Sequence, residues 1–407
     1  MKNTLITSEI GKIKKVIVHE PGQEIEIMTP DTAKELLFDD ILDLRTAQKE
    51  HNDFSSILKL HTNVFEVNDL LDELLNDEKN KETLLKQLIY ETGAPEAIFD
   101  ELMKYNAKEL RKTLITGSEE IYRKGYYTYS LPPLPNFFFT RDTAMVINDY
   151  VLSGSMANRI RSAEATIMRF ILKNHPEFIP EGFYFDNYDE IDSTSKFEGG
   201  DILVLRNDVL ALGLSERTTQ HAVEQIIEKL RKNGDIKHIF TVVLPKQRAT
   251  IHLDMVFTVL DTNFACIYEP VILGELNIGV YHIDISGKTS VTRSVPNLIE
   301  GLKDVGINLE PVLCGGPNRI NQDREQWMCG ANFFTLEPGK IIGYARSANT
   351  FIGLEKVAGL KRIEAEDVLS GKINLKNYDR YAIAFKGAEL SRGGGGARCM
   401  TLPILRD

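Results

Sequence analysis

Residues 198–244 of the chain read EGGDILVLRNDVLALGLSERTTQHAVEQIIEKLRKNGDIKHIFTVVL. Two short apolar runs flank the turn-forming pair Asn207-Asp208, a pattern that predicts two strands. A helical stretch and another apolar run follow, so the unit reads as two strands, a helix and a strand. The predicted elements are strands at Ile202–Leu205 and Val209–Leu212, a helix at Thr218–Lys232 and a strand at Ile239–Leu244.

The same alternation of strands and helices recurs along most of the chain, and it predicts an α/β fold. No sequence identity links the units, so any repeat is structural only. We expect a hairpin over Ala144–Leu152 that turns at Asn148-Asp149. Further predicted helices are Thr32–Leu58 and Asn158–Lys173, and further strands are Lys15–His19, Asn63–Val67, Met255–Val259, Phe264–Tyr268, Phe333–Leu336 and Lys340–Tyr344.

One region departs from this alternation. From about Asn68 to Tyr127 we find no convincing strand, only short helical runs that end at Gly93 and Gly117. We therefore expect a small helical bundle over residues 68–129, inserted into an α/β domain formed by residues 1–67 and 130–407.

The composition is that of a folded, acidic protein. The chain has 407 residues, 43% hydrophobic and 26% charged, with a formal net charge of -11. That negative charge argues against nucleic acid as a partner because it repels phosphate. No stretch approaches the roughly eighteen apolar residues of a membrane span, and the N-terminus lacks the apolar core of a secretory signal. The four cysteines form no C-x-x-C pair, so we expect a cytoplasmic protein.

The segment Ser391–Met400 reads SRGGGGARCM and is the first candidate site. Four consecutive glycines let the backbone approach a ligand, although no Gly-Lys-Ser/Thr follows to make a phosphate cradle. One interpretation is a flexible loop before a final strand, with Cys399 as an inert buried thiol. The other relies on the flanking Arg392 and Arg398, because positive charge lowers the pKa of a thiol and favours the reactive thiolate.

Two further clusters combine a carboxylate with an unusual neighbour. His252 and Asp254 would share one face of a strand, where the histidine is either a satisfied core residue or one of two metal ligands lacking a clear third. Glu198 precedes paired glycines at the start of an apolar strand. It is either a solvated acid in a turn or part of a functional site.

A fourth cluster, Leu134–Asp142, joins three aromatic residues to Arg141-Asp142. It reads either as core followed by a buried ion pair or as an apolar wall that ends in a carboxylate.

Taken in order, these clusters resemble the guanidine-modifying superfamily and, within it, the arginine deiminases. The resemblance covers essentially the whole chain and includes the helical insertion. It implies a five-bladed pseudo-symmetric α/β propeller of ββαβ units around a buried site. The matching segments are Phe38–Leu42, Leu134–Asn136, Phe139–Asp142, Glu198–Asp201, Arg217, His252–Asp254 and the glycine run that ends at Cys399-Met400.

The resemblance also implies a role for each matching residue. Cys399 would be the nucleophile, His252 the general acid and base, and Glu198 its carboxylate partner. Asp142 and Asp254 would grip a guanidinium. As two like charges held close they would repel each other, so we expect Asp254→Asn to cost the free protein little stability.

The residues expected to bind the rest of the substrate have several different roles. Asn136 and Arg217 would bind the substrate's α-carboxylate, Phe139 would form a wall beside its methylenes, and Ile41 belongs to the matching segment near the N-terminus. Many relatives carry a further arginine five residues before the cysteine, where this chain has Gly394. Arg398 or Arg392 would then supply the missing contact.

The implied reaction is hydrolysis of L-arginine to L-citrulline and ammonia through a thiouronium on Cys399, without a metal or an organic cofactor. We expect L-arginine as the small-molecule partner, no nucleic acid or membrane partner, and a homo-oligomer that is a dimer or a tetramer. The alternatives are an amidinotransferase that passes the same intermediate to an amine, a non-catalytic arginine-binding protein, and a structural module.

Overall fold

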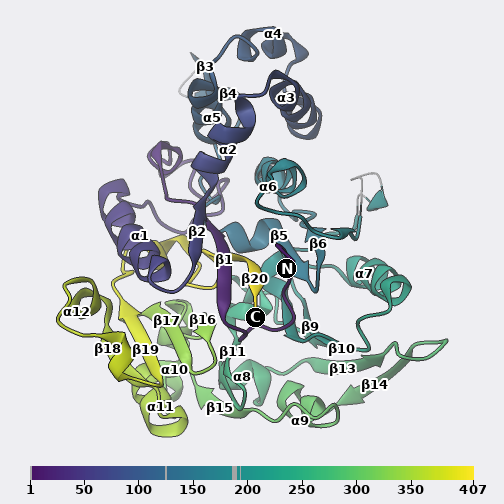
Figure 1. Cartoon of the computed structure of the whole chain (residues 1–407), viewed down its shortest axis with the longest axis vertical. Coiled ribbons are helices and arrows are strands. Elements are labelled where there is room, and N and C mark those ends of the chain that lie inside the picture. The colour runs from purple at the N-terminus through teal and green to yellow at the C-terminus, as the bar shows by residue number, and fades with distance from the viewer. Residues whose placement is uncertain (1, 124–125, 186–189, 193) are drawn as a thin grey trace.

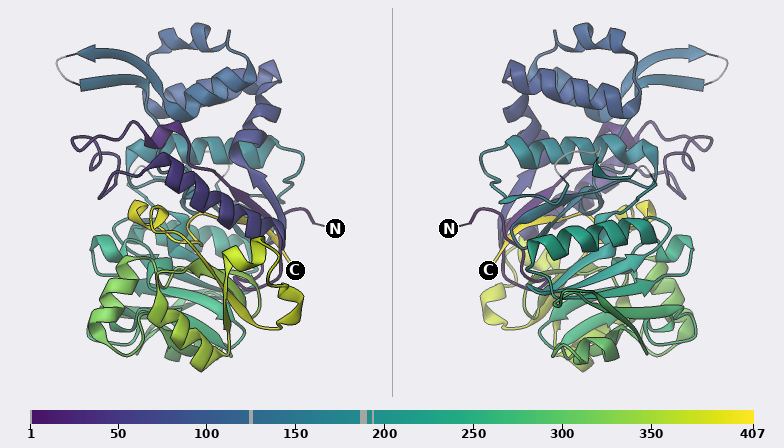
Figure 2. Two further views of the ribbon diagram at one scale, coloured as in Figure 1. Left: turned by 90° about the vertical axis from the view of Figure 1, so that its left-hand side faces the viewer. Right: turned by 90° about the vertical axis from the view of Figure 1, so that its right-hand side faces the viewer.

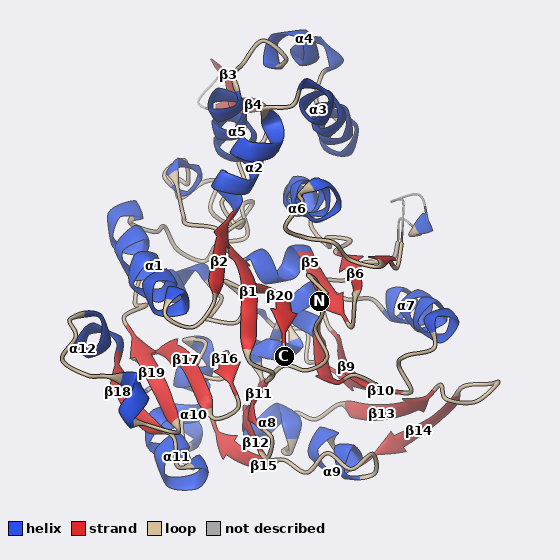
Figure 3. Cartoon of the chain, in the orientation of Figure 1, coloured by secondary structure: helices blue, strands red, loops and turns tan. Residues whose placement is uncertain are grey.

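The computed structural model describes residues 2–123, 126–185, 190–192 and 194–407. It is a mixed α/β fold with several separate sheets, and helices α2 to α5 lie together at one end (Figures 1 and 3). The helices are α1 Leu44–Lys59, α2 Val67–Leu75, α3 Glu78–Thr92, α4 Phe99–Leu102, α5 Ala107–Thr116, α6 Ser162–Asn174, α7 Gln220–Asn233, α8 Glu269–Ile272, α9 Leu298–Lys303, α10 Arg319–Trp327, α11 Ala348–Ala358 and α12 Ala365–Leu369. Within the described ranges, no helix has both the length and the apolar character needed to cross a membrane.

The unit predicted from residues 198–244 is confirmed. Strands β8 and β9 pair antiparallel, helix α7 follows, and β10 returns parallel to β9. Thr219 caps the N-terminus of α7 by accepting a hydrogen bond from the backbone N–H of Ala222, and Gly234 ends the helix in the left-handed conformation. The full sheet has the order β14-β13-β10-β9-β8, over Val291–Val295, Gly279–Asp284, His238–Val243, Val209–Leu214 and Ile202–Arg206.

The other large sheets repeat this arrangement of an antiparallel pair joined by a parallel strand. One sheet joins the chain ends, because β1 pairs antiparallel with β20 and parallel with β2. Its strands are β2 Asn63–Glu66, β1 Ile13–Val18 and β20 Leu402–Arg406. A second sheet contains β5 Ala144–Ile147, β6 Tyr150–Ser153 and β7 Gly182–Phe183, and a third contains β11 Phe257–Asp261, β12 Phe264–Ile267 and β15 Glu310–Leu313. A fourth contains β16 Phe334–Glu337, β17 Lys340–Tyr344, β19 Tyr381–Phe385 and β18 Lys361–Glu364.

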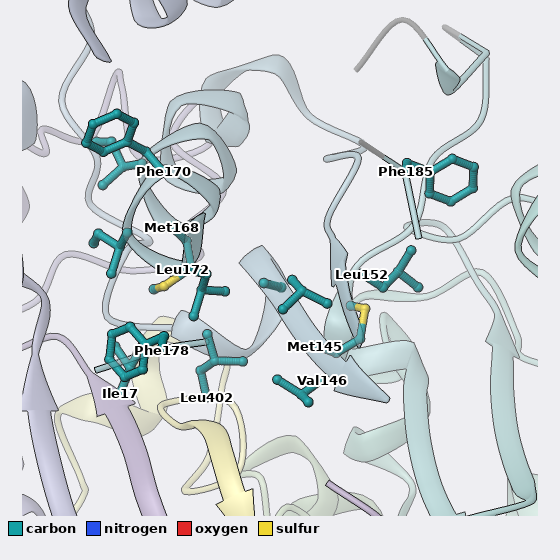
Figure 4. Packing of buried hydrophobic residues seen from close by; sticks show 14 of the residues in the cluster. Ile17, Met145, Val146, Leu152, Met168, Phe170, Leu172, Phe178, Phe185 and Leu402 are labelled. Atoms are coloured by element: carbon teal, nitrogen blue, oxygen red, sulfur yellow. The ribbon is translucent and has the colours of Figure 1, made fainter. Parts of the chain in front are cut away.

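A buried apolar cluster holds the terminal sheet against helix α6 and the hairpin β5–β6. Ile17 of β1 and Leu402 of β20 lie near Met168 and Leu172 of α6 in this cluster (Figure 4). Fully burying a side chain of this size stabilises a fold by about 1.5–3 kcal/mol. The packing therefore fixes the first residues of β5 and β20, just after the segments Leu134–Asp142 and Ser391–Met400 end.

Three predicted elements differ in the structure. The helix expected over Thr32–Leu58 begins only at Leu44, because the side chain of Asp43 accepts the backbone N–H of Thr46 and caps it there. Residues 251–254 are not a strand: His252 is extended and a 3-10 turn follows at Leu253–Met255.

The expected all-helical insertion also contains a hairpin. Strands β3 Ser118–Arg123 and β4 Tyr126–Leu131 pair antiparallel, and they lie at the same end of the molecule as α2 to α5 (Figure 2). The strands are rich in tyrosine and other β-formers, a local signal that the helical runs before them outweighed in the prediction.

Candidate active site

Cys399 follows the glycine run and is held rigidly by its backbone. The backbone N–H groups of Arg398 and Cys399 both donate to Oδ1 of Asn332, at 3.0 and 3.1 Å. The Cys399 carbonyl accepts the backbone N–H of Arg141 at 3.0 Å. The thiol is therefore buried in a fixed orientation, with its Sγ 3.7 Å from Oδ2 of Asp254.

The two arginines near Cys399 do not act as the sequence indicated. Arg398 Nη1 bonds Asp254 at 2.8 Å, and its other nitrogens bond Glu9 and the carbonyl of Ile202. Arg392 bonds Asp40 and Glu389 instead.

The expectation that these arginines favour the thiolate is wrong for the free protein. Burial, together with the nearby carboxylates of Asp254 and Asp142, raises the pKa of the Cys399 thiol well above its ordinary value. The positive charges that were expected to oppose this are neutralised by their own acidic partners.

His252 lies between two carboxylates. Its Nε2 donates to Oε2 of Glu198 at 2.9 Å, and its Nδ1 lies 3.6 Å from Oδ1 of Asp142. Burial lowers the pKa of His252, but the charge of Asp142 and the bond to Glu198 outweigh it, so the pKa rises to about 9. The imidazole is therefore charged at neutral pH and can donate a proton.

The Glu198–Asp201 segment positions this histidine. A side chain at Gly200 would place its Cβ 2.6 Å from the ring of His252, so the glycine permits the close approach. Asp201 accepts the backbone N–H of Leu253 at 2.9 Å and thereby ties the segment to the His252 turn. Gly200 and the second acid of this segment, Asp201, thus serve the geometry of His252.

Arg161 is a central residue that the sequence analysis did not single out. Its Nη1 bonds Oδ2 of Asp142 at 2.6 Å and lies 3.8 Å from Glu198, while its Nε bonds Glu164 at 2.9 Å. The spacing of Arg161 and Glu164 within a predicted apolar helix was the available signal, because such charges are buried only when paired. Asn332 gave no comparable signal.

A small buried hollow, the inner pocket, connects these groups. Its volume is about 20 Å³, little more than the roughly 10–15 Å³ that one water needs, so a larger ligand must widen it. Five of the expected site residues are not part of its lining: Glu198, Asp254, Arg392, Arg398 and the 37%-exposed Ile41. The lining comprises Leu37, Asn136, Phe139, Asp142, Arg161, Arg217, Arg248, Ile251, His252, Gly393, Gly394, Gly395 and Cys399.

Three of the acidic and histidine groups have the spacing of a cation site. The ligand atoms of Asp142, Glu198 and His252 lie within 4.8 Å of one another. Arg161 bonds Asp142 and approaches Glu198, so a guanidinium already supplies positive charge to these carboxylates. The cluster is therefore a network of ion pairs in which Arg161 and the charged His252 offset the two carboxylates.

The charge of His252 can be tested directly. In the wild-type protein, ¹⁵N-histidine NMR should show the His252 ring titrating near pH 9, and Glu198→Gln should lower that pKa because a stabilising negative charge is lost. Since the folded-state pKa is raised, the charged ring stabilises the fold below its ordinary pKa near 6.5, and this contribution disappears as the pH rises through 9. The remote His282 should titrate identically in both proteins; an unchanged His252 would refute the pairing.

Comparisons with known proteins identify the family of the chain. The family model of arginine deiminase matches residues 34–406. An arginine deiminase of Listeria monocytogenes serotype 4b is 35% identical over 99% of this chain and 97% of that protein.

Solved structures resemble the fold at lower identity. An amidinotransferase of Microseira wollei in the saxitoxin biosynthetic pathway has a TM-score of 0.57 at 14% identity, covering 99% of this chain and 97% of that one. A dimethylarginine dimethylaminohydrolase in adduct with S-methyl-L-thiocitrulline has a TM-score of 0.51 at 15% identity, covering 96% and 100%. With the family match spanning nearly every element described above, the chain belongs to the arginine deiminase family.

Proposed function

We propose that this protein hydrolyses L-arginine to L-citrulline and ammonia, with Cys399 as the covalent nucleophile. The observation that carries the proposal is the buried thiol of Cys399, which lines the inner pocket together with the charged His252 and lies 3.7 Å from the buried acid Asp254. Family membership points to the same reaction.

Asp142 and Asp254 would bind the guanidinium of the substrate. Oδ1 of Asp142 is buried and has no hydrogen-bond partner among the described residues, so an acceptor is available for a donor that enters the pocket. Charge-assisted bonds to both acids would hold the guanidinium carbon against the sulfur. The cation would also neutralise the two carboxylates that keep the thiol protonated, and so favour the thiolate at the moment of binding.

The reaction then proceeds in two halves. The thiolate forms a bond to the guanidinium carbon, His252 gives its proton to one nitrogen, and the carbon–nitrogen bond breaks to release ammonia. The neutral His252 next takes a proton from water, whose oxygen attacks the same carbon. Breaking of the carbon–sulfur bond returns the thiolate and leaves the ureido group of citrulline, so arginine and water balance the atoms.

Asn136, Phe139 and Arg217 would contact the rest of the substrate. Arg217 has fewer partners than Arg161. Among the described residues its guanidinium is bonded only to Glu198, at 3.5 Å. It suits the α-carboxylate, and the ring of Phe139 offers an apolar wall for the methylenes. We assign Arg398 a positioning role toward Asp254 in place of the expected carboxylate contact.

The larger architecture supports further proposals. Among the described residues, five sheets each contain an antiparallel pair and a parallel strand, and they support the five-bladed propeller for residues 1–67 and 130–407. Residues 68–129 would form the inserted unit, with a hairpin beside its helices.

All four cysteines are free, in keeping with the proposed cytoplasmic location. The dimer or tetramer stays a prediction.

A single assay tests the reaction against its nearest alternative. Purified protein given L-arginine alone should release citrulline and ammonia in equal amounts, because water can complete the second half-reaction. In H₂¹⁸O the label should enter the ureido oxygen of citrulline. An amidinotransferase would instead form ornithine, and only when an acceptor amine is added; an arginine-binding protein would form neither product.

A further inference from the structure

Arg248 lies at the junction between the inner pocket and a larger outer pocket. The outer pocket has a volume of about 210 Å³ and is formed largely by polar and charged residues. Arg248 and Gly394 are the two residues common to both linings. Arg248 therefore faces both pockets.

The guanidinium of Arg248 is held in place but keeps a free donor. Its Nε bonds Oδ2 of Asp39 at 2.6 Å, and its Nη2 donates to the carbonyl of Leu37 at 2.8 Å. Among the described residues, Nη1 has no partner. The side chain is 27% exposed, so the charge faces both protein and solvent.

Gly394 makes the room that Arg248 occupies. The glycine has φ +87°, which disfavours any side chain, and an added Cβ would lie 3.0 Å from Nη2 of Arg248. A side chain at position 394 would therefore crowd the guanidinium of Arg248.

The other arginines of this region are committed elsewhere. Arg161 bonds two acids and two backbone carbonyls, and Arg398 is 1% exposed with every guanidinium nitrogen bonded. Arg392 lines only the outer pocket. Of the arginines that line the inner pocket, Arg217 and Arg248 thus retain donors for a ligand.

We infer that Arg248 is a specificity-determining residue that binds the substrate's α-carboxylate together with Arg217. This inference rests on the proposed function. Asp142 and Asp254 hold the guanidinium at the buried end, so the carboxylate of the elongated substrate lies toward the junction. Nη1 of Arg248 donates to it while Nε keeps its bond to Asp39, so binding costs no existing ion pair.

The test compares a ligand with the carboxylate and one without it. The variants are Arg248→Ala, Arg248→Lys and, as a matched control, Arg206→Ala. Arg206 likewise bonds an aspartate, Asp208, and a backbone carbonyl, that of Val305, but it lines neither pocket. For each, the KM and kcat for L-arginine are measured, and agmatine, which lacks the carboxylate, is used as a competitor in the same assay to obtain its inhibition constant. Thermal melts verify folding.

Arg248→Ala should raise the KM for L-arginine at least ~10-fold, the scale of one lost charge-assisted bond, and change kcat and the agmatine constant less than ~3-fold. Arg248→Lys should restore part of the loss, and Arg206→Ala should resemble wild type. A parallel rise of both constants would mean that Arg248 only shapes the pocket, and no change in either would mean that it is a surface residue; both outcomes overturn the inference. Release of citrulline from L-arginine by the wild-type protein tests the proposed function independently. A failure of the inference about Arg248 can therefore be distinguished from a failure of the proposed function.

Discussion

Asp254→Asn is expected to lower kcat/KM for L-arginine by at least ~10³-fold. The amide removes a negative charge that the guanidinium requires and presents an N–H where an acceptor is needed, a loss of about 3–5 kcal/mol for a buried charged partner. Steady-state rates of citrulline release measure the effect. A kcat/KM within ~10-fold of wild type would contradict the guanidinium clamp.

The same variant should also melt at a lower temperature, contrary to the sequence-based expectation of little cost. Each acid of the supposed repulsive pair has its own arginine: Asp254 bonds Arg398 and Asp142 bonds Arg161. Asp254→Asn leaves a buried guanidinium with one acidic partner fewer, which is destabilising.

Asp261→Asn is the matched control, because Asp261 is a buried acid paired with Arg380 outside the site. It should lower the melting temperature and spare kcat/KM. If the two variants lost activity equally, the effect of Asp254→Asn would be one of folding.

The local sequence pattern was sufficient to predict many of the strands and helices of the fold. In residues 198–244 the apolar runs, the Asn207-Asp208 turn and the Thr219 cap each depend on neighbours in sequence, and the predicted elements are found there. The helix at Thr32–Leu58 shows the limit, since periodicity extended it past the cap at Asp43 that sets its start.

Two residues that the sequence did not indicate, Glu9 and Asn332, depend on long-range contacts. Glu9 meets Arg398 across 389 positions of sequence, and Asn332 receives the N–H of Cys399 across 67. No spacing rule within one segment could pair them. The pKa of Cys399 illustrates the same point, because its shift is decided by which acids fold against the thiol and not by which arginines flank it.

Cys399→Ala is expected to reduce kcat by a factor on the order of 10⁴–10⁶, the scale seen when a nucleophile is removed. Alanine is small and the backbone bonds to Asn332 do not depend on the side chain, so the fold should persist. Cys266→Ala, which removes another buried thiol, is the control and should retain activity. Rates and thermal melts are measured together, and a fully active Cys399→Ala would end the covalent account.

The most direct test is rapid quenching of the wild-type protein with L-arginine, followed by mass spectrometry of the peptide that contains Cys399. Covalent catalysis predicts a transient increase equal to the mass of arginine less ammonia, confined to Cys399 and decaying as citrulline appears. Turnover that proceeds with no such adduct at any quench time, or an adduct on Cys329 instead, would contradict the central claim that Cys399 is the nucleophile.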